Sequence, residues 1–201
     1  MPRNSFAPNP LRAEPLPART KWDRRYAQYS PTERLTANPL LTRWLPRLPR
    51  QGRALDVAAG AGRHSLALAR HGLQVHAVDI SWRGLRLLAQ RMEPGFPVAP
   101  VALDLQRGWL PATHYEVIVN FLFLERAIWP AIANRLARGG WLIVETFTVE
   151  QLTRPAKRHI RRDFLLEAGE LREAFGFLEI LHYHEGWHSS GATAQLVGRV
   201  K

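Results

Sequence analysis

The amino-acid sequence predicts an α/β fold, with a mostly parallel sheet, helices on both faces and a C-terminal antiparallel hairpin. From residue 53 onward, short segments rich in valine, leucine and isoleucine alternate with segments whose apolar residues recur at helical spacing. Segment 116–122 is almost entirely apolar, which is typical of a strand buried on both faces of a parallel sheet. Near the carboxyl terminus, two strand-like segments follow one another without a helix between them, and this indicates the hairpin.

The elements can be placed in order along the chain. The predicted strands cover 53–57, 74–79, 98–103, 116–122 and 141–147, and the hairpin joins 177–184 to 193–200 through a turn around 189–191. The predicted helices cover 63–71, 82–91, 128–137 and 167–175. Gly72, Pro94-Gly95 and Gly139-Gly140 end the first three of these helices.

The first 52 residues are less regular. Residues 1–20 contain five prolines, so we predict a mobile, basic, proline-rich arm there and a single domain over 21–201. Within 21–36 we predict two short helices separated at Ser30-Pro31, because proline after serine favours a helix start. Prolines interrupt 38–50, so any helix there is short.

Composition narrows the class of protein. The chain has 201 residues, of which 46% are hydrophobic, and this suits one globular domain with a sizeable core. There is no cysteine, which excludes disulfides, thiolate metal sites and a cysteine nucleophile. The first ten residues lack the apolar centre of a secretory signal, and no apolar segment approaches the roughly 20 residues that span a bilayer. We therefore expect a cytoplasmic protein without a membrane partner.

The net charge of +11 is concentrated in two places. Residues 1–50 hold ten basic and three acidic residues, and segment 154–162 adds five more basic residues. Arginine, which predominates over lysine here, is suited to phosphate and nucleic-acid recognition. No basic segment is interleaved with a known nucleic-acid motif, so we favour a solvated surface and keep RNA as the alternative partner.

Segment 53–81 joins two predicted strands through a loop of small residues, and each strand ends in an acid, Asp56 or Asp79. In an open α/β sheet, ligands bind beyond the carboxyl ends of the strands. Gly60 and Gly62 let the backbone approach a ligand closely, and the following helix directs free amides toward it. A carboxylate at Asp79 can accept hydrogen bonds from two ribose hydroxyls.

Two ligands fit that pattern, a nicotinamide dinucleotide and S-adenosylmethionine. The dinucleotide pattern G-x-G-x-x-G would find only Ser65 at its third position. Its first glycine also follows the strand directly, whereas this chain has Asp56 at the strand end, four residues before Gly60. An acid there repels a pyrophosphate and suits an ammonium or sulfonium ligand. The two acids, more than the glycines, therefore favour S-adenosylmethionine.

With these motifs the chain resembles the class I S-adenosylmethionine-dependent methyltransferases, over roughly residues 20–200. The segment D-V-A-A-G-A-G at 56–62 is similar to their first motif, with Ala58 where the family has glycine. Segments 75–81, 102–105 and 139–147 resemble later motifs. W-D-R-R-Y at 22–26 and segment 164–175 resemble the small tellurite-resistance and thiopurine-type enzymes. The resemblance implies a Rossmann-like, seven-stranded sheet with one antiparallel strand.

The resemblance also implies which residues hold the cofactor. Asp79 would bind the ribose, Asp104 and the Leu105 amide would meet the adenine, and Asn120 would face the methionine end. Arg25 would pair with the methionine carboxylate, with an aromatic, Trp22 or Tyr26, against the sulfonium. The full predicted set is Trp22, Arg25, Asp56, Ala58, Gly60, Gly62, Asp79, Ile80, Asp104, Leu105 and Asn120.

Several of these residues have a structural alternative. Asp56 can cap the following helix, Asp104 can be a turn residue, and Asn120 can be satisfied within the sheet. Trp22 and Tyr26, four residues apart, can pack one helical face onto the core.

The sequence does not identify a catalytic base. Methyl transfer from a sulfonium needs mainly orientation and desolvation, and a base only when the nucleophile arrives protonated. Glu145, Glu125 and His159 are the candidates for that role. His182 and His184 share one face of the predicted strand, with His188 beyond its end, but the chain has no cysteine, so we expect no metal site.

These observations predict a methyltransferase that acts on a small molecule. The N-P-P-Y motif of amino-methyltransferases is absent, since N-F-L-F stands at 120–123. A tRNA or rRNA methyltransferase, a non-catalytic binder of S-adenosylmethionine and a nicotinamide-dependent oxidoreductase remain the alternatives.

Overall fold

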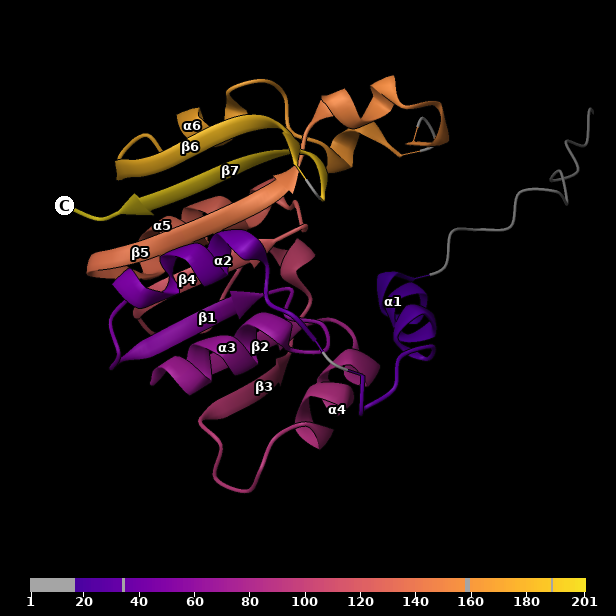
Figure 1. Cartoon of the computed structure of the whole chain (residues 1–201), viewed down its shortest axis with the longest axis vertical. Helices are drawn as coiled ribbons and strands as arrows, with labels where there is room; N and C mark the ends of the chain where they lie inside the picture. Colours follow the sequence, from indigo (N-terminus) through magenta and orange to yellow (C-terminus); the bar gives the residue numbers. More distant parts are fainter. Residues whose placement is uncertain (1–16, 34, 158–159, 189) are drawn as a thin grey trace, which may run out of the picture.

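A computed structural model describes residues 17–33, 35–157, 160–188 and 190–201. Its centre is a seven-stranded sheet in the order β3-β2-β1-β4-β5-β7-β6, as Figure 1 shows. The strands β1 to β5 run parallel to one another, and β7 is antiparallel to both of its neighbours, β5 and β6. The predicted fold class, including the terminal hairpin, is therefore confirmed.

Most predicted strands agree with the structure to within a few residues. The observed strands are β1 Arg53–Val57, β2 Gln74–Asp79, β3 Val98–Ala102, β4 Tyr115–Phe121, β5 Leu136–Phe147, β6 Glu179–His188 and β7 Gly191–Arg199. β1 lies between β2 and β4, so the strand order reverses there. At such a reversal the loops leave in opposite directions and open a ligand-binding crevice at the carboxyl edge.

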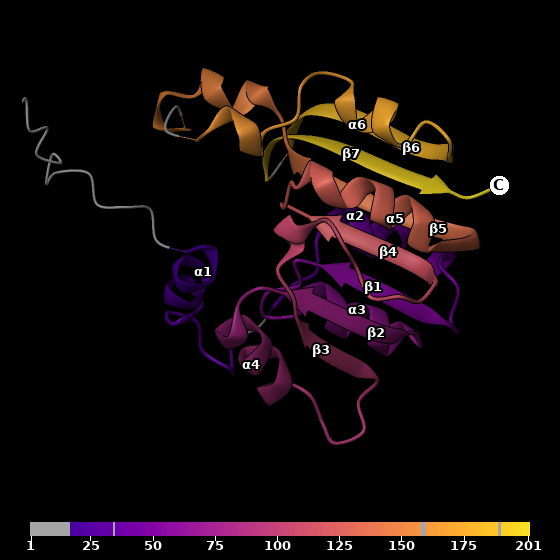
Figure 2. The same ribbon diagram turned by 180° about the vertical axis from the view of Figure 1, so that it is seen from behind.

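Helices cover both faces of the sheet. On one face lie α2 (Pro39–Trp44), α3 (Arg63–His71) and α4 (Trp82–Gln90), whose Leu41, Leu68 and Leu88 belong to one core cluster. On the other lie α5 (Trp129–Arg135) and α6 (Glu170–Ala174), whose Ile132 and Leu171 belong to the second. Figure 2, seen from behind, shows α5 and α6 over the sheet. Among the described residues, no helix is long and apolar enough to cross a membrane.

Three predicted helices differ from the structure. The second piece within 21–36 is not helical in its described residues: Ser30 Oγ accepts a hydrogen bond from Thr32 N (3.2 Å), which closes a single turn. α5 ends at Arg135 because Leu136 already pairs with Tyr115 of β4. α6 begins only at Glu170, after Gly169 in the left-handed region (φ 76°).

Two segments stand on either side of the carboxyl edge of the sheet (Figure 1). One is α1 (Ala18–Tyr26), whose first three residues fall in the range predicted for the arm, while residues 1–16 of that arm lie outside the described residues. The other is a series of short 3₁₀ turns, η4 (Val149–Thr153), η5 (Pro155–Lys157) and η6 (Arg162–Phe164).

Candidate functional site

The loop between β1 and α3 has the backbone that its glycines predict. Gly60 and Gly62 have φ angles of 56° and 83°, in the left-handed region that glycine adopts without strain. A Cβ at Gly60 would collide with the Tyr26 hydroxyl, and one at Gly62 would collide with Leu88. Both positions therefore need glycine, for conformation and for space.

Asp79 ends β2 directly beside this loop. Its Oδ2 accepts a hydrogen bond from Gly60 N (2.8 Å) and its Oδ1 accepts one from Ser81 N (2.7 Å). The carboxylate is 6% exposed, and burial raises its pKa above the usual range although both amides oppose that shift. Ser81 Oγ, not Asp79, caps α4 by accepting from Gly84 N (3.0 Å). Asp79 is thus held in place while its remaining lone pairs are free to meet hydroxyl donors.

Asp56 is also buried, but it is bonded to α3. Its Oδ2 accepts a hydrogen bond from Ser65 Oγ (2.6 Å), and its Oδ1 lies 3.8 Å from His64 Nδ1. The His64 ring packs against Phe121, with centroids 4.2 Å apart. The Asp56 Oδ1 atom is buried and has no hydrogen-bond partner among the described residues. In this arrangement Asp56 supports the loop from the α3 side, and its cofactor contact stays a prediction.

Two non-glycine residues near this edge have a left-handed backbone. Ala58, which replaces the family's first glycine, and Leu122, which follows β4, both have φ of 57°. Such a conformation costs about 1–3 kcal/mol for a residue with a Cβ and is common at functional sites. Ala58 therefore keeps the backbone path of a glycine while adding a methyl group beside the loop.

α1 carries the residues predicted to cover the cofactor. Trp22 and Tyr26 stack with centroids 6.3 Å apart, and the Arg25 guanidinium lies 5.4 Å from the Trp22 ring centroid. None of the nine residues of α1, all of which the structure describes, is buried. Trp22 and Tyr26 are half-buried and belong to neither core cluster, while the Tyr26 ring packs against Gly60 and Gly84. Their cofactor role and their packing role both stay predictions.

The remaining predicted cofactor residues lie at the ends of β2, β3 and β4. Ile80 follows Asp79 and is half-buried. Leu103 N donates to Asp79 O (3.0 Å), which places Asp104 and Leu105 beside the end of β2. Asp104 Oδ1 accepts from Gln106 N (3.1 Å) at the start of the turn η2 (Leu105–Arg107), so the turn role is present.

Asn120 lies at the carboxyl end of β4 and is 2% exposed. Its Oδ1 atom has no hydrogen-bond partner among the described residues. Buried amide oxygens are almost always paired, so an unpaired one at this edge is an acceptor suited to a cationic or N–H-bearing ligand. Together, the Asn120 oxygen, the glycine loop and Asp79 fit a nucleoside cofactor that carries an ammonium group.

The candidate bases are placed differently. Glu145, near the end of β5, is 1% exposed and accepts hydrogen bonds from Ser190 Oγ, Thr193 Oγ1 (3.4 Å) and Gln195 Nε2 (3.1 Å). Glu125 accepts from Ala127 N (3.1 Å) and caps η3 (Arg126–Ile128). His159 lies outside the described residues. The two described carboxylates thus have structural partners on β7 and η3.

Arg126 anchors the segment after β4 to η6 and the start of α6, a role that does not follow from the sequence. Its guanidinium forms a two-pronged pair with Glu170, with Nη2 2.7 Å from Oε2, and donates to the carbonyls of Asp163 and Leu165 at 3.0 Å each. The pair fixes η6 and the start of α6 against the segment after β4. Partners 37 to 44 residues apart leave no local signal in the sequence.

The histidines of β6 make other contacts. His184 Nδ1 and His188 Nε2 are 3.1 Å apart, and His182 Nε2 is 3.2 Å from Gln195 Oε1. Burial, followed by the neighbouring His184, lowers the pKa of His188. Within the described ranges, no group of three or more histidine or acidic side chains is arranged to hold a metal ion.

Comparisons with known proteins agree with this geometry. The methyltransferase domain family matches residues 54–140. A Bacillus subtilis (strain 168) protein named as methyltransferase YqeM is 33% identical over 66 residues, which are 32% of this chain and 27% of that protein.

Solved structures share the fold. TehB from Haemophilus influenzae superposes with a TM-score of 0.62 at 21% identity, over 74% of this chain and 57% of TehB. Magnesium protoporphyrin IX methyltransferase (ChlM) from Synechocystis PCC 6803, with bound S-adenosylhomocysteine, superposes with a TM-score of 0.66 at 16% identity, over 94% of this chain and 90% of ChlM. The chain thus spans about a quarter of YqeM and little more than half of TehB. The sheet order is that of the Rossmann-like methyltransferase fold, and residues 54–140 within it match the methyltransferase domain family.

Proposed function

We propose that this protein transfers a methyl group from S-adenosylmethionine to a small-molecule acceptor. The observation that carries the proposal is the pairing of Asp79 with the Gly60 amide at the reversal of strand order. It combines a loop that admits a ligand close to the backbone with a fixed, buried carboxylate for ribose hydroxyls.

Each part of the cofactor has its own residues in the proposal. Gly60, Gly62 and Ala58 form the loop beneath the cofactor, and Asp79 holds the ribose, with Asp104 and Leu105 beside the adenine. Asn120 offers its unpaired oxygen to the ammonium group, and Arg25 offers a cation to the carboxylate. When bound, S-adenosylmethionine supplies a methyl carbon already activated by a positively charged sulfur. The protein's contribution is then to orient the acceptor and exclude water.

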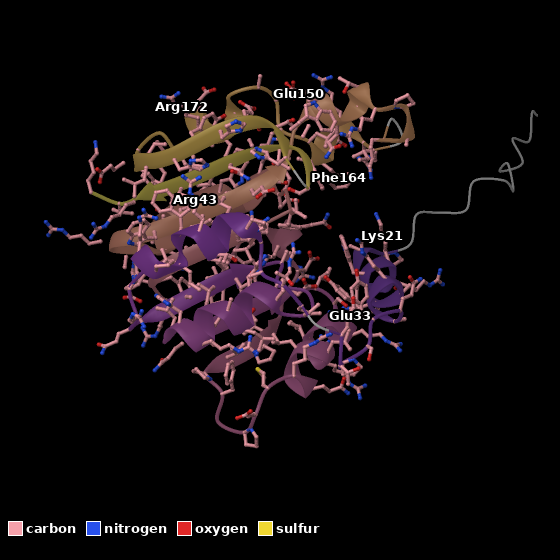
Figure 3. The ribbon with its side chains drawn as sticks, in the orientation of Figure 1. Lys21, Glu33, Arg43, Glu150, Phe164 and Arg172 are labelled. Carbon is pink, nitrogen blue, oxygen red and sulfur yellow. The ribbon has the colours of Figure 1, made fainter. Side chains whose placement is uncertain are left out.

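The acceptor would approach between the two segments that flank the carboxyl edge. Figure 3 shows Lys21 of α1 on one side of this edge and the exposed Phe164 of η6 on the other. Glu145 and Glu125 are engaged by neighbouring donors, so the proposal assigns no base and favours an acceptor that is nucleophilic without losing a proton. A small molecule is further supported by ChlM, whose name gives magnesium protoporphyrin IX as its acceptor.

Two measurements test the proposal in sequence. Isothermal titration should show binding of S-adenosylhomocysteine and none of NAD, and binding of NAD alone would overturn the cofactor. Release of S-adenosylhomocysteine should then be followed with a panel of small-molecule nucleophiles and with bulk tRNA. Turnover only with tRNA would replace the small-molecule acceptor with RNA, and absence of turnover across a broad panel would favour a non-catalytic binder.

A further inference from the structure

α1 is attached to the rest of the molecule by a few polar contacts. It has no buried residue, and α4 is the element that it contacts most extensively. The attachment depends on Asp23, whose Oδ1 accepts hydrogen bonds from Ser81 Oγ (2.6 Å) and from Arg83 N (3.0 Å). Arg83 N belongs to the first turn of α4, so Asp23 also places a negative charge at that helix N-terminus.

These contacts continue without a break into the cofactor site. Ser81 donates its hydroxyl to Asp23 and its amide to Asp79, and Asp79 accepts in turn from the Gly60 amide. Four groups on α1, the start of α4, the end of β2 and the glycine loop thus form one hydrogen-bonded series. A displacement of α1 therefore acts on the same serine that orients the ribose carboxylate.

The position of α1 also brings a side chain over the loop. The Tyr26 hydroxyl lies where a Cβ on Gly60 would be, and Tyr26 Cδ2 would lie 3.1 Å from a Cβ on Gly84. The ring therefore fills the space directly above Gly60. Burial and the nearby Asp79 carboxylate both raise the pKa of this phenol, so it stays protonated. A ribose that binds Asp79 must enter beside or through this space.

We propose that Asp23 is a latch that controls the passage of the nucleoside cofactor, with Tyr26 as the part of α1 that closes the loop. The latch opens by breaking the Asp23–Ser81 and Asp23–Arg83 hydrogen bonds and closes again after the cofactor enters. Because the same two hydrogen bonds hold α1 before and after the cofactor binds, they slow its entry and its release alike. Asp23 is a positioning residue in this role, and the inference rests on the proposed binding of S-adenosylmethionine.

Rates of S-adenosylhomocysteine binding test the latch directly. In surface plasmon resonance on the full chain, Asp23→Ala should raise the association and dissociation rate constants by about tenfold each, since hydrogen bonds to a charged acceptor are lost. The equilibrium dissociation constant should change less than either rate. Asp23→Asn keeps the acceptor oxygen without its charge. Its two rate constants should lie between those of the wild-type protein and those of Asp23→Ala.

The control is Arg24→Ala, which removes an exposed charge from the same helix and should leave both rates unchanged. Thermal unfolding of each variant without ligand verifies the fold, and Asp23→Asn decides the question if Asp23→Ala does not unfold cooperatively. A rise in dissociation alone would show that Asp23 acts only on the bound state and would overturn the latch, as would unchanged rates. Absence of binding by the wild-type protein is a separate outcome and would overturn the proposed cofactor instead.

Discussion

The carboxylate of Asp79 and the amide of Gly60 meet at 2.8 Å and join the end of β2 to the loop after β1. Nineteen residues of chain separate them, and the whole of α3 lies in between. A second amide, from Ser81, holds the other carboxylate oxygen at 2.7 Å. The carboxylate is therefore oriented before any ligand arrives, which reduces the cost of binding.

Asp79→Ala should abolish binding of S-adenosylhomocysteine, with an affinity loss of at least about 100-fold, because hydrogen bonds to a charged group are worth about 1.5–3 kcal/mol each. The circular dichroism spectrum should remain that of a folded α/β protein. Glu93→Ala, which removes an exposed acid after α4, is the control and should bind normally. Unchanged affinity in Asp79→Ala would remove the central assignment of the site.

Proton release should accompany cofactor binding in mildly acidic solution. Burial raises the folded-state pKa of Asp79, so this group favours the folded state below its unfolded pKa and loses that contribution as pH rises through the folded value. Ribose hydroxyls favour the ionised form, so binding lowers the pKa and expels a proton. Titrations at about pH 5, above the ordinary pKa of aspartate, in buffers of different ionisation enthalpy should detect this release. The release should decrease as pH rises through the folded-state pKa of Asp79, and proton uptake at pH 5 would contradict it.

Ala58→Gly should stabilise the protein. Relief of the left-handed conformation at φ 57° outweighs the extra chain entropy of glycine, for a net gain of about 1 kcal/mol. The expected rise in melting temperature is about 2–4 °C for a chain of this length. The neighbouring Ala59, which is buried and not in the left-handed region, provides the matched control: Ala59→Gly should lower the melting temperature. An equal loss in both variants would show that Ala58 is unstrained.

Arg126→Lys should lower the free energy of unfolding by about 1 kcal/mol, because lysine cannot keep the two-pronged contact and both hydrogen bonds to the carbonyls. This value is already reduced for the solvent exposure of the pair. The hydrogen bond from Arg126 lowers the pKa of Glu170, so its contribution is present at neutral pH and is lost as pH falls through the folded value. Urea unfolding at pH 7 and about pH 3 should show the difference shrinking in acid.

The matched control for that experiment is Arg162→Lys. Arg162 forms a similar two-pronged pair with Glu167, at 2.7 Å for both contacts, but the side chains are 64% and 50% exposed. Arg162→Lys should therefore lower the free energy of unfolding by no more than about 0.5 kcal/mol. Equal effects at Arg126 and Arg162 would mean that the contacts to the Asp163 and Leu165 carbonyls contribute nothing.

Local patterns were sufficient to predict much of the fold. The bounds of β1 and β2 are predicted to the residue, because each is a short apolar segment that begins just after a glycine turn and ends at or next to an acid. The end of α5 could not be predicted in this way. Leu136 leaves the helix to pair with Tyr115, and that partner is 21 residues earlier in the chain. Likewise, the helix start predicted at Ser30-Pro31 is replaced by a turn that Ser30 closes with its own side chain.

The site was predictable to the extent that it follows from strand ends. Asp79 and Gly60 meet because parallel strands present their carboxyl ends at one edge. The orientation of Asp56 toward Ser65 and the burial of Glu145 against β7 depend on which neighbour supplies a donor, and the sequence does not show this. Asp23 stood inside a recognised motif, W-D-R-R-Y, yet its partner Ser81 is 58 residues away, so its function emerged only from the structure.

Because α1 has no buried residue, its sequence can change access to the candidate site without changing the stability of the core. Substitutions in a core helix must preserve volume, whereas the outward positions of α1 can vary in size and charge without creating a cavity. A helix of this kind offers a place where selection, or a protein engineer, can change what reaches the candidate site while the sheet and its two cores keep their stability. Libraries restricted to the positions of α1 other than Trp22, Asp23, Arg25 and Tyr26 are accordingly an economical route to altered acceptor preference, if the proposed methyl transfer holds.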